Sequence, residues 1–134
     1  MNLSGSRPFS RIATVLYTLW GLLHVGLGVS MVAGVDAEML TDEAVAESTM
    51  FFLCAVVFGC QAIAVALTMN RHNSRAGHWL NLLVLGAVDL AFLPVMVVPG
   101  HVDPVGGLSG PLVWLLAAVA STLARRREPA SVTT

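Results

Sequence analysis

The chain contains no lysine and few charged residues of any kind. Of its 134 residues, 11% are charged and 56% are hydrophobic, and the mean hydropathy is +0.78. A soluble domain carries about 25% charged residues, so most of this surface is predicted not to face water. With a net charge of −1, the chain has no basic field for nucleic acid, which excludes that class of partner. A basic set made only of arginine is typical of a GC-rich bacterial genome.

Cysteine is also scarce, and the familiar catalytic motifs are missing. Cys54 and Cys60 lie six residues apart in one apolar stretch, which on a helix separates them by about 9 Å along the axis. That spacing excludes a disulfide between them. The sequence has no phosphate-binding loop, dinucleotide-binding turn or nucleophile elbow. It therefore assigns no catalytic residue, no metal and no cofactor, and it leaves enzymatic activity open.

Four long apolar stretches account for most of the chain. About 20 apolar residues are needed for a helix that crosses a membrane, and short links join antiparallel neighbours. The sequence thus predicts an all-α fold, a four-helix transmembrane antiparallel bundle, formed by residues 1–128 as one domain. A disordered tail is expected at 129–134. The predicted spans are 12–35, 49–69, 79–98 and 109–124.

Prolines and a serine indicate local features of the third and fourth spans. Pro94 lies inside the third span, where it removes a backbone hydrogen bond and predicts a kink. Ser109 is a plausible N-cap for the fourth span, with Pro111 in its first turn. In the links, His72 and His78 are expected to be solvated or interfacial.

The charges divide between the two sides of these spans. All seven arginines fall on one side, whereas six of the eight acidic residues fall on the other; Asp89 and Glu128 are the exceptions. Cytoplasmic links carry the excess of basic residues. The pattern predicts a multi-pass protein of the bacterial cytoplasmic (inner) membrane with both termini in the cytoplasm. The arginines are Arg7, Arg11, Arg71, Arg75 and Arg125–Arg127.

Three polar residues lie near the middle of three different spans. His24, Gln61 and Asp89 are each about 15–20 Å from the flanking charged residues at 1.5 Å per residue. A carboxyl group in the middle of a membrane helix is costly and calls for partners. We expect these three residues to be one another's hydrogen-bond partners, with His24 and Asp89 as an imidazolium–carboxylate pair or as a neutral pair that shares one proton.

Aromatic residues of the first and fourth spans are predicted to line such a site. Tyr17 shares a stripe of the first span with His24, flanked by Gly21 and Gly28, which let a neighbouring backbone come close. Trp20 lies in the same part of the span, and Trp114 is the contribution expected from the fourth span. The candidate residues for binding a ligand or a proton are His24, Gln61, Asp89, Tyr17, Trp20 and Trp114.

Three functions fit this pattern. The favoured one is a membrane-embedded pocket for a small apolar or amphipathic molecule, such as a lipid, a quinone or an isoprenoid. In size, helix number and buried polar groups the chain resembles the small four-helix membrane families typified by DoxX-like proteins and sterol-isomerase-type bundles. The alternatives are an accessory or assembly subunit of a larger membrane complex and a proton-coupled transporter acting as a homodimer. Small multidrug-type exporters carry their membrane carboxylate as a glutamate in the first helix, where this chain has His24.

Overall fold

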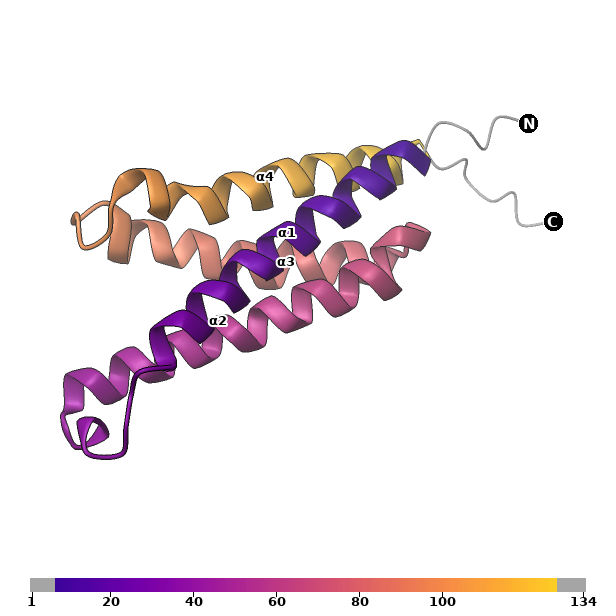
Figure 1. The fold of residues 1–134 in the computed structure, drawn as a ribbon. Helices are drawn as coiled ribbons and strands as arrows, with labels where there is room; N and C mark the ends of the chain where they lie inside the picture. The colour runs from indigo at the N-terminus through magenta and orange to yellow at the C-terminus, as the bar shows by residue number, and fades with distance from the viewer. Residues whose placement is uncertain (1–6, 128–134) are drawn as a thin grey trace.

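The computed structural model describes residues 7–127, and within them the chain is entirely helical (Figure 1). Four of the helices are long and apolar enough to cross a membrane, as the sequence predicted. The predicted disordered tail at 129–134 lies outside the described residues. The long helices are α1 (Arg7–Val32), α2 (Glu43–Thr68), α3 (Arg75–Phe92) and α4 (Pro104–Arg126), and the short ones are η1 (Met39–Thr41), η2 (Asn70–His72) and η3 (Leu93–Val97).

The helices begin earlier than the apolar stretches that predicted them. The carboxylate of Asp42 accepts a hydrogen bond from the backbone N–H of Val45 at 3.1 Å, so α2 begins at Glu43 rather than at residue 49. The first span likewise begins at Arg7 and ends at Val32 instead of covering 12–35. Hydropathy marks only the part of a helix that is apolar, whereas capping groups fix where its backbone begins.

The start of α4 differs from the prediction in its cap as well. Asp103, not Ser109, caps the helix, because its carboxylate accepts from the N–H of Gly106 at 2.8 Å. Pro104 takes the first helical position, which tolerates proline because its N–H is not needed there. Pro111 consequently lies inside α4.

The predicted kink at Pro94 takes the form of a π-helical turn. α3 ends at Phe92, and η3 continues it as a wider turn in which the N–H of Val98 donates to the carbonyl oxygen of Leu93 at 2.9 Å. Proline cannot donate the hydrogen bond of a regular α-helix, and a five-residue turn accommodates that loss.

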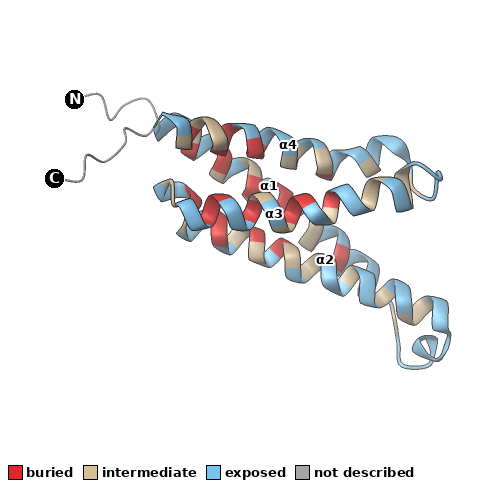
Figure 2. Ribbon diagram, turned by 180° about the vertical axis from the view of Figure 1, so that it is seen from behind, coloured by how far each residue is buried: buried red, intermediate tan, exposed pale blue. Residues whose placement is uncertain are grey.

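The core lies in the half of the molecule where α1 begins and α4 ends. Helix α1 packs mainly against α2 and α4, and α3 packs against α4 and α2. Figure 2 shows the buried residues gathered toward this half, while the other half is largely exposed. Large apolar side chains such as Leu22, Leu83 and Leu116 are more than half exposed on the outer faces, as expected where lipid rather than protein surrounds a helix.

Glycines set the close crossing of α1 and α2. A Cβ on Gly21 would lie 2.6 Å from the carbonyl oxygen of Gly59, and a Cβ on Gly59 would lie 2.7 Å from the carbonyl oxygen of Gly21. Farther along α1, a Cβ on Gly28 would lie 2.6 Å from the carbonyl oxygen of Phe52. The expected approach of a neighbouring backbone to Gly21 and Gly28 therefore occurs, and the neighbour is α2.

Gly59→Ala should weaken this crossing. The added methyl group meets a backbone oxygen that cannot rotate away, so α1 and α2 must separate, and we expect the free energy of unfolding to fall by about 1–3 kcal/mol. The measurement is thermal unfolding in detergent micelles, followed by circular dichroism.

Gly26→Ala is the matched control, because a Cβ on Gly26 meets nothing within 4 Å. Its expected effect is neutral or a stabilisation of about 0.5–1 kcal/mol, since alanine favours a helix over glycine. Equal losses in the two variants would contradict the role given to the crossing.

Candidate functional site

The buried carboxyl group of Asp89 is held by a tryptophan of another helix. Asp89 lies on α3 and is 2% exposed. The indole N–H of Trp20, on α1, donates to Oδ2 of Asp89 at 2.9 Å. Trp20 itself is fully buried, so this hydrogen bond is protected from competing solvent and ties α1 to α3.

His24 is oriented by the same tryptophan. Its ring stacks on the ring of Trp20, with centroids 3.6 Å apart and an interplanar angle of 19°. Nδ1 of His24 lies 2.8 Å from the backbone oxygen of Trp20. Because a carbonyl oxygen only accepts, Nδ1 carries the proton and donates it. In the neutral imidazole, Nε2 is therefore the nitrogen with the free lone pair.

His24 and Asp89 face the same point beside α4. A Cβ on Gly110 would lie 3.4 Å from Nε2 of His24 and 3.5 Å from Oδ1 of Asp89. Among residues 7–127, neither atom has a hydrogen-bond partner, and no ion pair joins the two side chains. We call Nε2 of His24 and Oδ1 of Asp89 the acceptor pair. The sequence predicted that these residues would partner each other directly, whereas the structure holds both through Trp20.

Trp114 forms a wall next to this pair. A Cβ on Gly86 would lie 2.5 Å from Cζ2 of Trp114, so the indole covers α3 one turn before Asp89. Its N–H donates to the backbone oxygen of Leu82 at 3.3 Å. The indole N–H is thus already used, and Trp114 offers the site only its apolar surface.

Gln61 does not reach Asp89, contrary to the expected contact. Its amide N–H donates to Oδ1 of Asn81 at 3.0 Å, and Nδ2 of Asn81 donates to Oδ1 of Asn70 at 3.1 Å. We call Gln61, Asn81 and Asn70 the amide cluster. Oε1 of Gln61 is buried and has no partner within the described part of the chain. Gln61 lies 10 residues before Arg71, whereas Asp89 lies 14 residues after Arg75, so Gln61 is nearer than Asp89 to the end of the helices that carries the arginines.

Tyr17 belongs to a third polar group. Its hydroxyl lies 3.5 Å from Oγ of Ser121, which in turn lies 2.9 Å from Nδ1 of His78. His78 is 8% exposed, which corrects its expected place in a solvated link. The reason is that α3 begins at Arg75, so His78 lies on the helix and not before it. The spacing of His78, Asn81 and Asp89 along one face was the signal that sequence reasoning missed.

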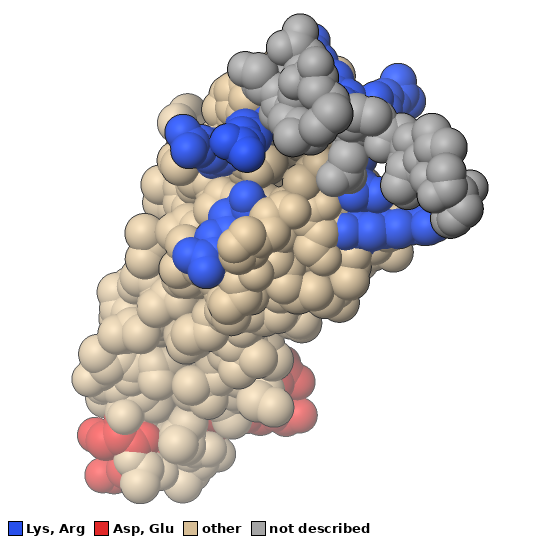
Figure 3. All heavy atoms as spheres, turned by 90° about the vertical axis from the view of Figure 1, so that its right-hand side faces the viewer, with Lys and Arg blue, Asp and Glu red and all other residues tan. Residues whose placement is uncertain are grey.

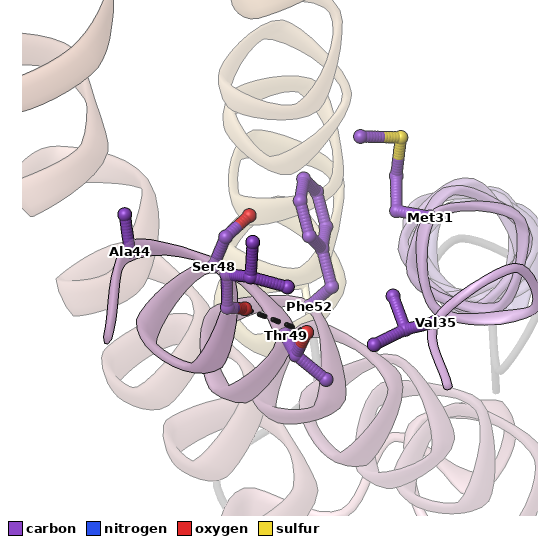
Figure 4. A pocket seen from close by; sticks show the side chains of 7 residues that line it. Met31, Val35, Ala44, Ser48, Thr49 and Phe52 are labelled. Atoms are coloured by element: carbon purple, nitrogen blue, oxygen red, sulfur yellow. Dashed lines mark hydrogen bonds between the residues drawn. The ribbon is translucent and has the colours of Figure 1, made fainter. Parts of the chain in front are cut away.

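Two cavities lie between α1 and α2. One, of about 350 Å³, is lined by residues of α1 between Thr14 and Leu22 together with Leu67 of α2. The other, of about 250 Å³, lies near the end of α1 and is shown in Figure 4, where Met31 and Phe52 flank it. We call the second one the outer groove. Neither of these two cavities includes the acceptor pair. The outer groove is lined by Met31, Val35, Ala44, Val45, Ser48, Thr49 and Phe52.

The described residues contain no group of three or more His, Cys, Asp or Glu side chains that could hold a metal ion. Comparison of the chain with protein-family models, with curated proteins and with solved structures found no match. The site must therefore be interpreted from its own geometry.

Trp20→Phe should destabilise the protein through Asp89. Phenylalanine can still stack on His24 but cannot donate, which leaves the buried carboxyl group without its hydrogen bond. We expect the free energy of unfolding to fall by about 1–3 kcal/mol, measured by thermal unfolding in micelles. Trp79→Phe is the control, since Trp79 is 47% exposed and should change stability by less than about 0.5 kcal/mol.

Proposed function

We propose that this protein is a multi-pass protein of the bacterial inner membrane that binds a small amphipathic molecule, such as a lipid or an isoprenoid, at the acceptor pair. One observation carries the proposal. Asp89 is 2% exposed, yet Oδ1 has no protein partner within residues 7–127 and faces Nε2 of His24, which has none either. A polar group of a ligand at this point could form hydrogen bonds with these two atoms.

The hydrocarbon around the helices gives these two atoms no water to bond with. In hydrocarbon, a polar group without a hydrogen bond costs several kcal/mol, because no water can replace the missing partner. Asp89 and His24 are mounted on rigid helices, and the stack and the hydrogen bond to Trp20 fix the His24 ring. The pair is thus preorganised to receive a polar group.

The apolar part of the ligand would follow α1 toward the outer groove. Met31 lies seven residues after His24, which puts both on one stripe of the helix about 10 Å apart. Met31 lines the outer groove together with Phe52. A molecule with its polar end at the acceptor pair and its apolar chain along this stripe would reach that groove.

The distribution of charge supports the orientation included in this proposal. On the face shown in Figure 3, arginines gather at the end where α1 begins and α4 ends, and acidic residues gather at the opposite end. Basic residues favour the cytoplasmic side. The termini are therefore assigned to the cytoplasm and the acidic link before α2 to the periplasm.

Asp89→Asn should release the ligand. The amide oxygen can still accept from Trp20, so the fold is expected to persist, but Nδ2 then presents a donor where Oδ1 accepted. We expect native mass spectrometry of protein extracted from its own membrane to show a small bound molecule on the wild type and about tenfold less on the variant.

Asp103→Asn is the control, because it also neutralises a carboxylate but leaves a good N-cap on α4 and lies away from the pair. It should retain the molecule. A protein without a bound molecule in all three forms would contradict the proposal. Retention of another polypeptide alone would favour an accessory subunit instead.

A topology experiment tests the orientation separately. A green fluorescent protein fused after the last residue should fluoresce, because it folds in the cytoplasm, and alkaline phosphatase inserted in the link between α1 and α2 should be active, because it requires the periplasm. The reverse pattern would overturn the assigned orientation without affecting the site.

A further inference from the structure

The hydrogen bonds around His24 determine what kind of polar group the acceptor pair can receive. Nδ1 donates to the carbonyl oxygen of Trp20, so Nε2 of the neutral ring can only accept. Oδ2 of Asp89 is already used by the indole N–H. The atoms left for a ligand are Nε2 and Oδ1, and neither Trp20 nor Trp114 has an N–H left to donate toward them, because both indole N–H groups are used.

A ligand that only accepts hydrogen bonds cannot satisfy this arrangement. A ketone, an ether or an ester would bring an oxygen lone pair against the lone pair of Nε2. An ammonium group has three N–H bonds to satisfy, and the pair offers two atoms. A hydroxyl group has a proton to donate, so it can donate to Nε2 or to Oδ1, which an ether, a ketone or an ester cannot do.

The space at the pair points to the same group. Gly110 is the residue of α4 that approaches it, and a Cβ there would already lie 3.0 Å from Cε1 of His24. Neither cavity extends to this point. Only a small polar group such as a hydroxyl could enter beside Gly110, and a neighbour would have to shift by a few tenths of an ångström to admit it.

We infer that the ligand of this site is a membrane-soluble alcohol, whose hydroxyl donates to Nε2 of His24 beside Gly110. This inference rests on the proposed binding function, and it adds the chemical class: a long-chain or isoprenoid alcohol binds, and its ether, ketone or ester does not.

The test uses farnesol and farnesyl methyl ether, which share one apolar chain and differ in the hydroxyl proton. Each is titrated into the purified full-length protein in micelles and its binding is measured by isothermal titration calorimetry, with empty micelles as the blank. The alcohol should bind about tenfold to a hundredfold more tightly than the ether. Dodecylamine serves as the ammonium probe and should bind more weakly than farnesol.

Two variants connect the result to the site. Gly110→Ala should lower farnesol affinity at least tenfold, because its methyl group occupies the place of the hydroxyl. Gly106→Ala, on the same helix, should bind like the wild type, since its Cβ would meet only Oδ2 of Asp103 at an ordinary 3.6 Å. If Gly110→Ala does not fold, His24→Phe replaces it: the ring that stacks on Trp20 remains while Nε2 is removed, with the same expected loss.

The outcomes separate the inference from the proposed function. Equal binding of the ether, or tighter binding of dodecylamine, with loss in Gly110→Ala, would overturn the alcohol and leave a binding site. Binding unchanged in both Gly110→Ala and His24→Phe would overturn the inference at this location. No binding of any probe, together with a bare protein in native mass spectrometry, would overturn both.

Discussion

The hydrogen bond from Trp20 to Asp89 is the interaction on which the rest of the arrangement depends. A carboxyl group among apolar helices needs a hydrogen-bond donor, and here the donor is the indole N–H of Trp20, which is itself fully buried. The same residue supplies the stacking surface and the backbone oxygen that orient His24. Its neighbour Gly21 permits the close crossing with α2. One turn of α1 therefore positions α2, α3 and the candidate site together.

Much of the fold could be predicted from the sequence, because membranes impose a simple rule on composition. The length of the apolar stretches was enough to predict four helices, and their position among apolar residues made His24 and Asp89 candidates for a site. The partner of Asp89 could not be predicted, because depth along the membrane normal says nothing about rotation around a helix axis. Gln61 illustrates this limit: it was expected at the depth of Asp89 and in contact with it, but its side chain donates to Asn81 of α3 instead.

Polar contacts hold the bundle together in the half where α1 begins and α4 ends. The amide cluster joins α2 to α3 through Gln61 and Asn81, and the group around Ser121 joins α1, α3 and α4. Such contacts are individually modest between membrane helices, about 0.6–2 kcal/mol each. Together with the acceptor pair they place polar groups at several levels of the core.

The buried residues are concentrated at one end of the helices, and this determines which end of the molecule opens more readily. In α2, every buried residue lies between Gly59 and Ala66, so the first four turns of that helix contribute little to the core. Regions with few buried contacts unfold locally at a lower free energy than the core. The helix ends beside the acidic link should therefore open more readily than the opposite half of the molecule, which stays packed. The proposed ligand would then reach His24 from within the bilayer, without crossing an aqueous phase.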